Sequence, residues 1–199
     1  EGDSFAARKD IIGFDDVINK QRKVIYEQRN KVLDSDDIED DIINMISYLV
    51  NDLLSNFNED EEITKEDIKE INKNLAENFY FSAEDIDSLI IGSKFKYLSV
   101  EIEKVMIKKY LLFKNNNEEN FEKEILLDTV DSFWIEYIKD LEYLRQGINL
   151  RSYKQVDPVQ EFQIESSKMF NNMSRNIKLA TVKNLLEYIH KNNEVFELV

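Results

Sequence analysis

Apolar residues recur at helical spacing along most of the chain. The first stripe occupies residues 4–33, and a helix of that length spans about 45 Å at ~1.5 Å per residue. Further stripes follow at residues 38–57, 68–79, 85–113 and 118–146, and a last one begins near residue 158. Since the first stripe is far longer than an average globular helix, the pattern predicts an all-α fold built around one long helix.

Two short motifs predict where helices begin in the middle of the chain. Thr64-x-x-Asp67 and Ser82-x-x-Asp85 resemble capping boxes, in which a hydroxyl and a carboxylate each accept a hydrogen bond from a backbone N–H near the start of a helix. We expect the second motif to start a helix that runs to about Phe113.

Single residues predict the other boundaries. Ser35 or Asp36 is expected to cap the second helix. Gly147 is expected to end the helix that starts near residue 118, because glycine adopts the left-handed conformation at little cost. Asp157 and Pro158 suit an N-cap and a first helical position, so they predict the start of the last helix. Two long helices joined by a short loop are expected to form an antiparallel hairpin.

Composition supports helix and limits the kind of partner. The chain has only one proline and four glycines, so few residues interrupt a helix. Its net charge of −15 disfavours binding to nucleic acid, because phosphates would be repelled. No stretch approaches the roughly 18 apolar residues that suggest a membrane span, and the absence of cysteine excludes disulfides.

The sequence offers little for catalysis or metal binding. His190 is the only histidine, and we expect a surface histidine near the end of a helix rather than a catalytic base. Glu187-x-x-His190 has the spacing of a di-iron ligand pair, but such a bundle needs that pair twice. The glycine-rich loops that hold nucleotides are missing from the sequence. We therefore expect no catalytic, cofactor or metal site in this chain.

Two segments resemble a known family. The sequence GFDDVINKQRKVIYEQR at residues 13–29 is similar to the long scaffold helix of SecA preprotein translocase motors. LDTVDSFW at residues 127–134 and LRQGINLRSYKQVDP at residues 144–158 resemble the two-helix finger of the same motors. The segments stand in the family's order. Residues 34–117, between them, correspond to the family's helical wing by position and helical character alone.

The resemblance implies a domain organisation. Residues 1–33 are expected to form the long scaffold helix, residues 34–117 an inserted small helical wing, and residues 118–199 the antiparallel two-helix finger packed with that helix. Some positions depart from the family pattern: Tyr137 stands where histidine is usual, and Lys154 where alanine or glycine is common. These departures resemble an accessory SecA paralogue more than the housekeeping motor.

The resemblance also implies functional residues. On the scaffold helix, contact with the ATPase domains and transmission of the nucleotide state are expected from Arg8, Asp15, Asp16, Asn19, Gln21, Arg22, Tyr26 and Arg29. At the fingertip, contact with a SecY-type channel and the preprotein is expected from Leu150, Arg151, Ser152, Tyr153, Lys154 and Gln155. Tyr153 matches the family's tip tyrosine, whose ring and hydroxyl suit contact with varied polypeptide.

What the resemblance implies about the whole protein goes further. The two nucleotide-binding domains and the preprotein-binding domain would precede Glu1, and ATP and magnesium would bind there. This chain alone is expected to be inactive, as part of an ATP-driven export motor in the bacterial cytoplasm and on the cytoplasmic face of the membrane. One alternative is a stand-alone helical adaptor that binds a partner through its long helices. A carboxylate–metal bundle enzyme is a second alternative, which the single Glu-x-x-His pair disfavours.

Overall fold

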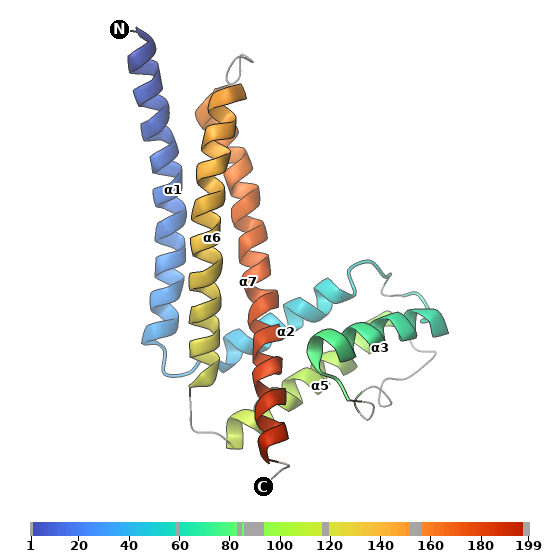
Figure 1. Ribbon diagram of the computed structural model, residues 1–199. Coiled ribbons are helices and arrows are strands. Elements are labelled where there is room, and N and C mark those ends of the chain that lie inside the picture. The colour runs from blue at the N-terminus through green and yellow to red at the C-terminus, as the bar shows by residue number, and fades with distance from the viewer. Residues whose placement is uncertain are drawn as a thin grey trace. The chain divides into compact units, whose positions relative to one another are not determined.

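The computed structural model is built from helices. It describes residues 2–58, 60–82, 85, 94–116, 120–151 and 157–196, without the side chains of residues 2–7, 149–151 and 193–196. The described helices are α1 (Gly2–Asp34), α2 (Glu39–Leu53), α3 (Lys65–Phe79), α5 (Phe95–Asn116), α6 (Phe121–Arg151) and α7 (Pro158–Phe196) (Figure 1). An isolated bridge between Glu62 and Lys94 is the one β pairing in the described part of the chain. The predicted all-α fold is confirmed for these residues.

The chain divides into two compact units. One contains residues 1–37 and 126–177, and the other contains residues 38–125 and 178–199. The first unit, here called the scaffold unit, holds α1 and most of α6 with the first half of α7. The second, here called the wing unit, holds α2, α3 and α5 with the first turn of α6 and the end of α7. The predicted domains, 1–33, 34–117 and 118–199, stay predictions.

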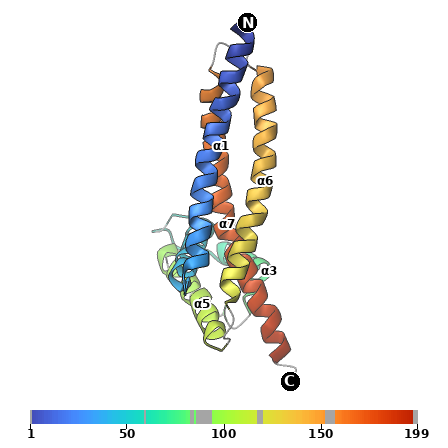
Figure 2. The same ribbon diagram turned by 90° about the vertical axis from the view of Figure 1, so that its left-hand side faces the viewer.

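In the scaffold unit, α1 runs alongside α6 and α7 in both views (Figures 1 and 2). Near the start of α7, Phe14 is fully buried and its ring centroid lies 4.8 Å from that of Phe162. Gly13 lies beside Val159, and a Cβ atom on Gly13 would be only 2.6 Å from a Val159 methyl carbon. The missing side chain therefore lets α1 and α7 approach closely at this point.

The wing unit has a core made mainly of apolar and aromatic side chains. Phe57 stacks on Phe95 with ring centroids 4.4 Å apart. Tyr188 of α7 contacts both Phe113 and Phe121, at centroid distances of 5.9 and 5.4 Å. Such aromatic pairs add to the stabilisation that burial of their area already gives.

A lysine joins three helices of the wing unit. The Lys114 ammonium lies 3.2 Å from a carboxylate oxygen of Glu39 and 3.2 Å from one of Glu122. Glu39 belongs to the first turn of α2 and Glu122 to the first turn of α6, where the helix dipole favours negative charge. Glu122 is buried, so its charge depends on Lys114 for compensation.

Local sequence signals located several helix ends correctly. Thr64 and Asp67 form the predicted capping box at the start of α3. Ser82 and Asp85 exchange the same reciprocal hydrogen bonds, while residues 86–93 lie outside the described part. Asp157 caps α7 by accepting hydrogen bonds from the backbone N–H groups of residues 159 and 160, at 2.8 and 3.3 Å.

Four predictions about local structure were wrong. The helix predicted to run from the Ser82 motif to about Phe113 is interrupted, because Lys94 pairs with Glu62 in the isolated bridge and α5 begins at Phe95. Gly147 does not end α6, which continues to Arg151, because burying Ile148 outweighs the ~1 kcal/mol that glycine costs inside a helix. Ser35 and Asp36 do not cap α2, whose N-cap position is Ile38, and the Ser35 hydroxyl instead donates to the carbonyl of residue 31. His190, expected at the surface, is half-buried and stacks on the Tyr80 ring with centroids 4.8 Å apart.

We expect the sign of a Gly13→Ala substitution to depend on Val159. Alone, it should lower the free energy of unfolding by about 1 kcal/mol, because overpacking costs roughly 2 kcal/mol and improved helix propensity returns about 1. In a Val159→Ala background the methyl groups are gone, so Gly13→Ala should be neutral or stabilising. Urea unfolding of the four proteins measures this, and an equal effect in both backgrounds would contradict the close approach.

Removing the Lys114 charge should destabilise the wing unit. Lys114→Met leaves Glu39 and Glu122 without their shared cation, and we expect a loss of about 3 kcal/mol in unfolding free energy. Lys73→Met is the matched control, because Lys73 is exposed and only pairs with Glu77 along α3 at 3.9 Å. Thermal unfolding followed by circular dichroism compares the two. Similar shifts for both variants would show that the Lys114 pairs carry no special weight.

Candidate functional site

The predicted fingertip lies at the end of the described part of the hairpin. Leu150 and Arg151 form the last residues of α6, and their side chains are outside the described residues. Ser152, Tyr153, Lys154 and Gln155 are also outside them. Their predicted contact with a channel and a preprotein stays a prediction.

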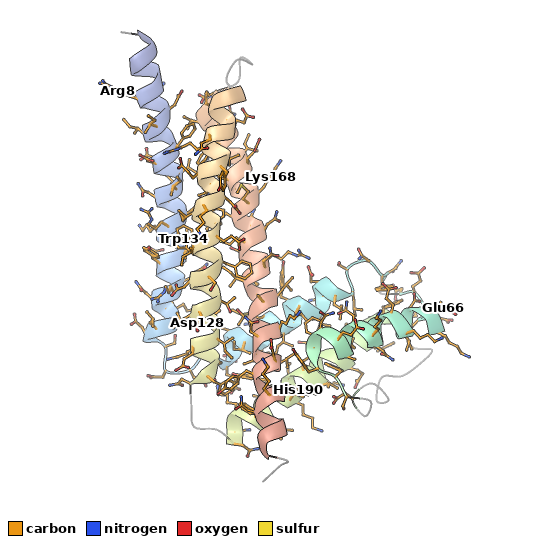
Figure 3. All side chains as sticks on the ribbon, in the orientation of Figure 1. Arg8, Glu66, Asp128, Trp134, Lys168 and His190 are labelled. Carbon is orange, nitrogen blue, oxygen red and sulfur yellow. The ribbon has the colours of Figure 1, made fainter. Side chains whose placement is uncertain are left out.

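The predicted coupling residues of the scaffold helix fall into two groups, which differ in whether they contact the other helices of the scaffold unit. Arg8, Asp16, Asn19 and Arg22 are exposed, and Arg8 extends away from α6 and α7 (Figure 3). Arg22 donates a hydrogen bond of 3.1 Å to the Asn19 side chain. Within the described residues, these four side chains make no hydrogen bond or ion pair with α6 or α7. The other four, Asp15, Gln21, Tyr26 and Arg29, contact α6 or α7.

Gln21 takes part in a polar cluster that joins all three helices of the scaffold unit. The buried Tyr137 hydroxyl lies 2.8 Å from Gln21 Oε1 on α1 and 3.0 Å from the Ser166 carbonyl oxygen on α7. The Gln21 amide also donates to the Ser166 hydroxyl at 3.5 Å. Burial raises the pKa of Tyr137, which the hydrogen bond to Gln21 partly opposes, so the hydroxyl keeps its proton as a donor.

Tyr26 and Arg29 contact α6 further along α1. The Tyr26 ring meets the edge of Trp134, whose side chain is mostly buried, with centroids 6.3 Å apart. Arg29 forms a two-bond pair with Asp131, at 2.8 and 3.0 Å. The hydrogen bond from Arg29 lowers the pKa of Asp131, and the same bond raises the pKa of Arg29. Both contacts face a groove of about 470 Å³ that Asn30 and Ile135 also line.

Sequence reasoning missed the polar partners of these residues on α6 and α7. Asp131 and Ser166 carried no predicted role, and Tyr137 was noted only as a departure from the family pattern. Asp15 of α1 pairs with Arg145 of α6, and Arg29 of α1 pairs with Asp131 of α6. The residue numbers of the partners on α6 therefore fall as the residue numbers on α1 rise. Knowledge of this antiparallel register would have predicted the partners, but no short sequence motif reveals the register.

Other features of the described residues point to no further chemistry. No group of three or more histidine, cysteine or acidic side chains in the described part is placed to hold a metal ion. A second groove, of about 310 Å³, follows the seam between α6 and α7, with Phe133, Met169 and Met173 beside Glu136 and Asp140. None of the described helices is long and apolar enough to cross a membrane.

The pair of Arg29 and Asp131 should be coupled in stability at neutral pH. In a double-mutant cycle with Arg29→Gln and Asp131→Asn, we expect a coupling larger than that of the exposed Lys23–Glu27 pair on the same helix. Because the pKa of Asp131 is lowered in the folded protein, the contribution is present above its ordinary value of ~3.9 and is lost as the pH falls through the lowered pKa. Urea unfolding at several pH values tests this, and equal coupling for both pairs would refute it.

Comparison with known proteins identifies the family. Residues 1–189 match the family model described as "SecA Wing and Scaffold domain". The chain is 38% identical over 194 residues to a protein translocase subunit SecA of Clostridium kluyveri, which covers 94% of this chain and 23% of that protein. It is 39% identical over 191 residues to the SecA of Clostridium tetani, covering 93% of this chain and 23% of that protein. The chain thus spans less than a quarter of the length of these relatives, and it belongs to the SecA wing and scaffold domain family.

Proposed function

We propose that this chain is the part of a SecA-type export motor that holds a two-helix finger against a scaffold helix. The observation that supports the proposal is that some residues of α1 contact the hairpin while others stay exposed. Gln21, Tyr26 and Arg29 bind the hairpin of α6 and α7, whereas Arg8, Asp16 and Arg22 stay exposed. A helix that holds the hairpin through some side chains and keeps other charged side chains exposed suits a part that connects the hairpin to another domain.

The finer proposal concerns what the two ends of this arrangement contact. The exposed face of α1 would pair with nucleotide-binding and preprotein-binding domains of the parent protein, which would bind ATP and magnesium. Leu150 to Gln155 would enter a SecY-type channel and contact the preprotein. The parent would work as a protein-translocating ATPase, at the cytoplasmic face of a bacterial membrane, in an accessory rather than a housekeeping system.

Removing the tip tyrosine should impair export without unfolding the chain. In the full-length protein, we expect Tyr153→Ala to slow translocation of a preprotein into vesicles, because the ring that meets the polypeptide is lost. Tyr143→Ala is the matched control, since Tyr143 lies on the same hairpin and its side chain is 72% exposed. Helical content and melting temperature of both variants should match the unsubstituted protein. An unchanged translocation rate for Tyr153→Ala would count against the tip assignment.

Photocrosslinking separates this proposal from a stand-alone adaptor. A photoreactive residue at position 153 of the full-length protein should crosslink to the channel or to a stalled preprotein, and one at position 143 should do so less. If a folded, ATP-hydrolysing protein gives no crosslink at position 153, the adaptor becomes the better explanation. An adaptor would instead be captured through its long helices by a single partner protein, with no dependence on ATP.

A further inference from the structure

We infer that Gln21, Tyr137 and Ser166 act as a register pin, which fixes how far α1 is advanced along the hairpin of α6 and α7. The Tyr137 hydroxyl stands between an acceptor on α1 and an acceptor on α7, at 2.8 and 3.0 Å. The three residues thus connect every helix of the scaffold unit in one polar cluster, in which Tyr137 and Ser166 are buried and Gln21 is partly exposed. The inference rests on the proposed function and deepens it, because the register decides where the hairpin holds its tip relative to α1.

The apolar residues next to Gln21 do not select a register by themselves, so in the middle of α1 the polar cluster must add to what Gly13 and Arg29 fix further along the helix. The residues one turn from Gln21 on either side are Val17, Ile18, Val24 and Ile25, and none has a polar side-chain atom. If α1 moved by one turn, about 5.4 Å, an apolar side chain would still meet the apolar surface of the hairpin. The Tyr137 hydroxyl, however, would lose its partner on α1, and the Gln21 amide would lose both of its contacts.

A buried polar cluster in an apolar interface suits this role. Leaving a buried donor or acceptor unpaired costs more than its hydrogen bond adds, so a register that places the Gln21 amide against apolar surface is penalised more than the aligned one is rewarded. A single buried polar residue fixes the register of coiled coils in the same way. Tyr137 is 4% exposed and its ring packs against Trp134 and Phe170, at centroid distances of 5.6 and 5.9 Å. The ring therefore stays in place when only the hydroxyl is removed.

The register can be measured with pairs of spin labels in the full-length protein. This chain contains no cysteine, so labels at introduced cysteines are specific once any cysteine elsewhere in the parent has been replaced. One pair joins positions 20 and 132, and the other joins positions 27 and 143, all of them exposed. Since α1 and α6 are antiparallel, sliding of α1 shortens one distance and lengthens the other, whereas splaying lengthens both.

We expect one narrow distance for each pair in the unsubstituted protein. Tyr137→Phe, Gln21→Met and the double variant should add a second population, with opposite changes of up to about 5.4 Å in the two pairs. The double variant should recover the melting temperature lost by the single ones, because both polar partners are gone, but it should not recover the single register. Ile25→Val trims the same interface without touching the cluster and should keep one distance.

Two outcomes would overturn the inference. Unchanged single distances in Tyr137→Phe and the double variant would mean that the other contacts of α1, including those of Gly13 and Arg29, set the register without the cluster. Distances that lengthen together in both pairs would mean that the cluster only holds the helices close. Neither readout uses export, so a failure of the pin and a failure of the proposed motor function are told apart.

Discussion

The close approach of α1 to α7 at Gly13 is the constraint on which the rest of the scaffold unit depends. Val159 occupies the space that a side chain at position 13 would need, with a methyl carbon 2.6 Å from the place of its Cβ atom. Because the backbones meet there, Phe14 can bury its ring against Phe162. Gln21, Tyr26 and Arg29 stand at fixed distances along α1 from that point, so the later contacts must be compatible with it.

Contacts of α1 change character along its length. Near the start of α7 they are apolar and tight, in the middle they are buried and polar, and further on a partly exposed ion pair joins Arg29 to Asp131. Apolar packing supplies attraction without direction, whereas the hydroxyl of Tyr137 and the guanidinium of Arg29 add direction. A helix held in both ways can transmit a displacement along its axis, which is what a connecting part of a motor must do.

Sequence reasoning predicted the helices and those ends that depend on neighbouring residues. The capping box of Thr64 and Asp67 needed only a spacing of three, and Asp157 needed only the proline that follows it. Gly147 misled because its local preference was outweighed by the burial of Ile148, which depends on distant residues. Half of the coupling residues proved to have partners on α6 or α7, and Asp131 and Ser166 were recognised as partners only from the packing of α6 and α7 beside α1. The fingertip residues, Ser152 to Gln155, lie outside the described residues, so the structure does not test their predicted role.

The chain contains one tryptophan, and its position gives the scaffold unit its own optical signal. Trp134 is 8% exposed and sits between Tyr26 of α1 and Tyr137 of its own helix. Fluorescence excited at the long-wavelength edge of tryptophan absorption therefore comes only from Trp134, where α1 meets α6. Far-ultraviolet circular dichroism, in contrast, reports the summed helix content of both units. In this chain, separation of α1 from the hairpin would expose Trp134 and shift its emission to longer wavelength, even where the helices stay intact. The tryptophan therefore lets the scaffold unit be followed by itself, without any added dye.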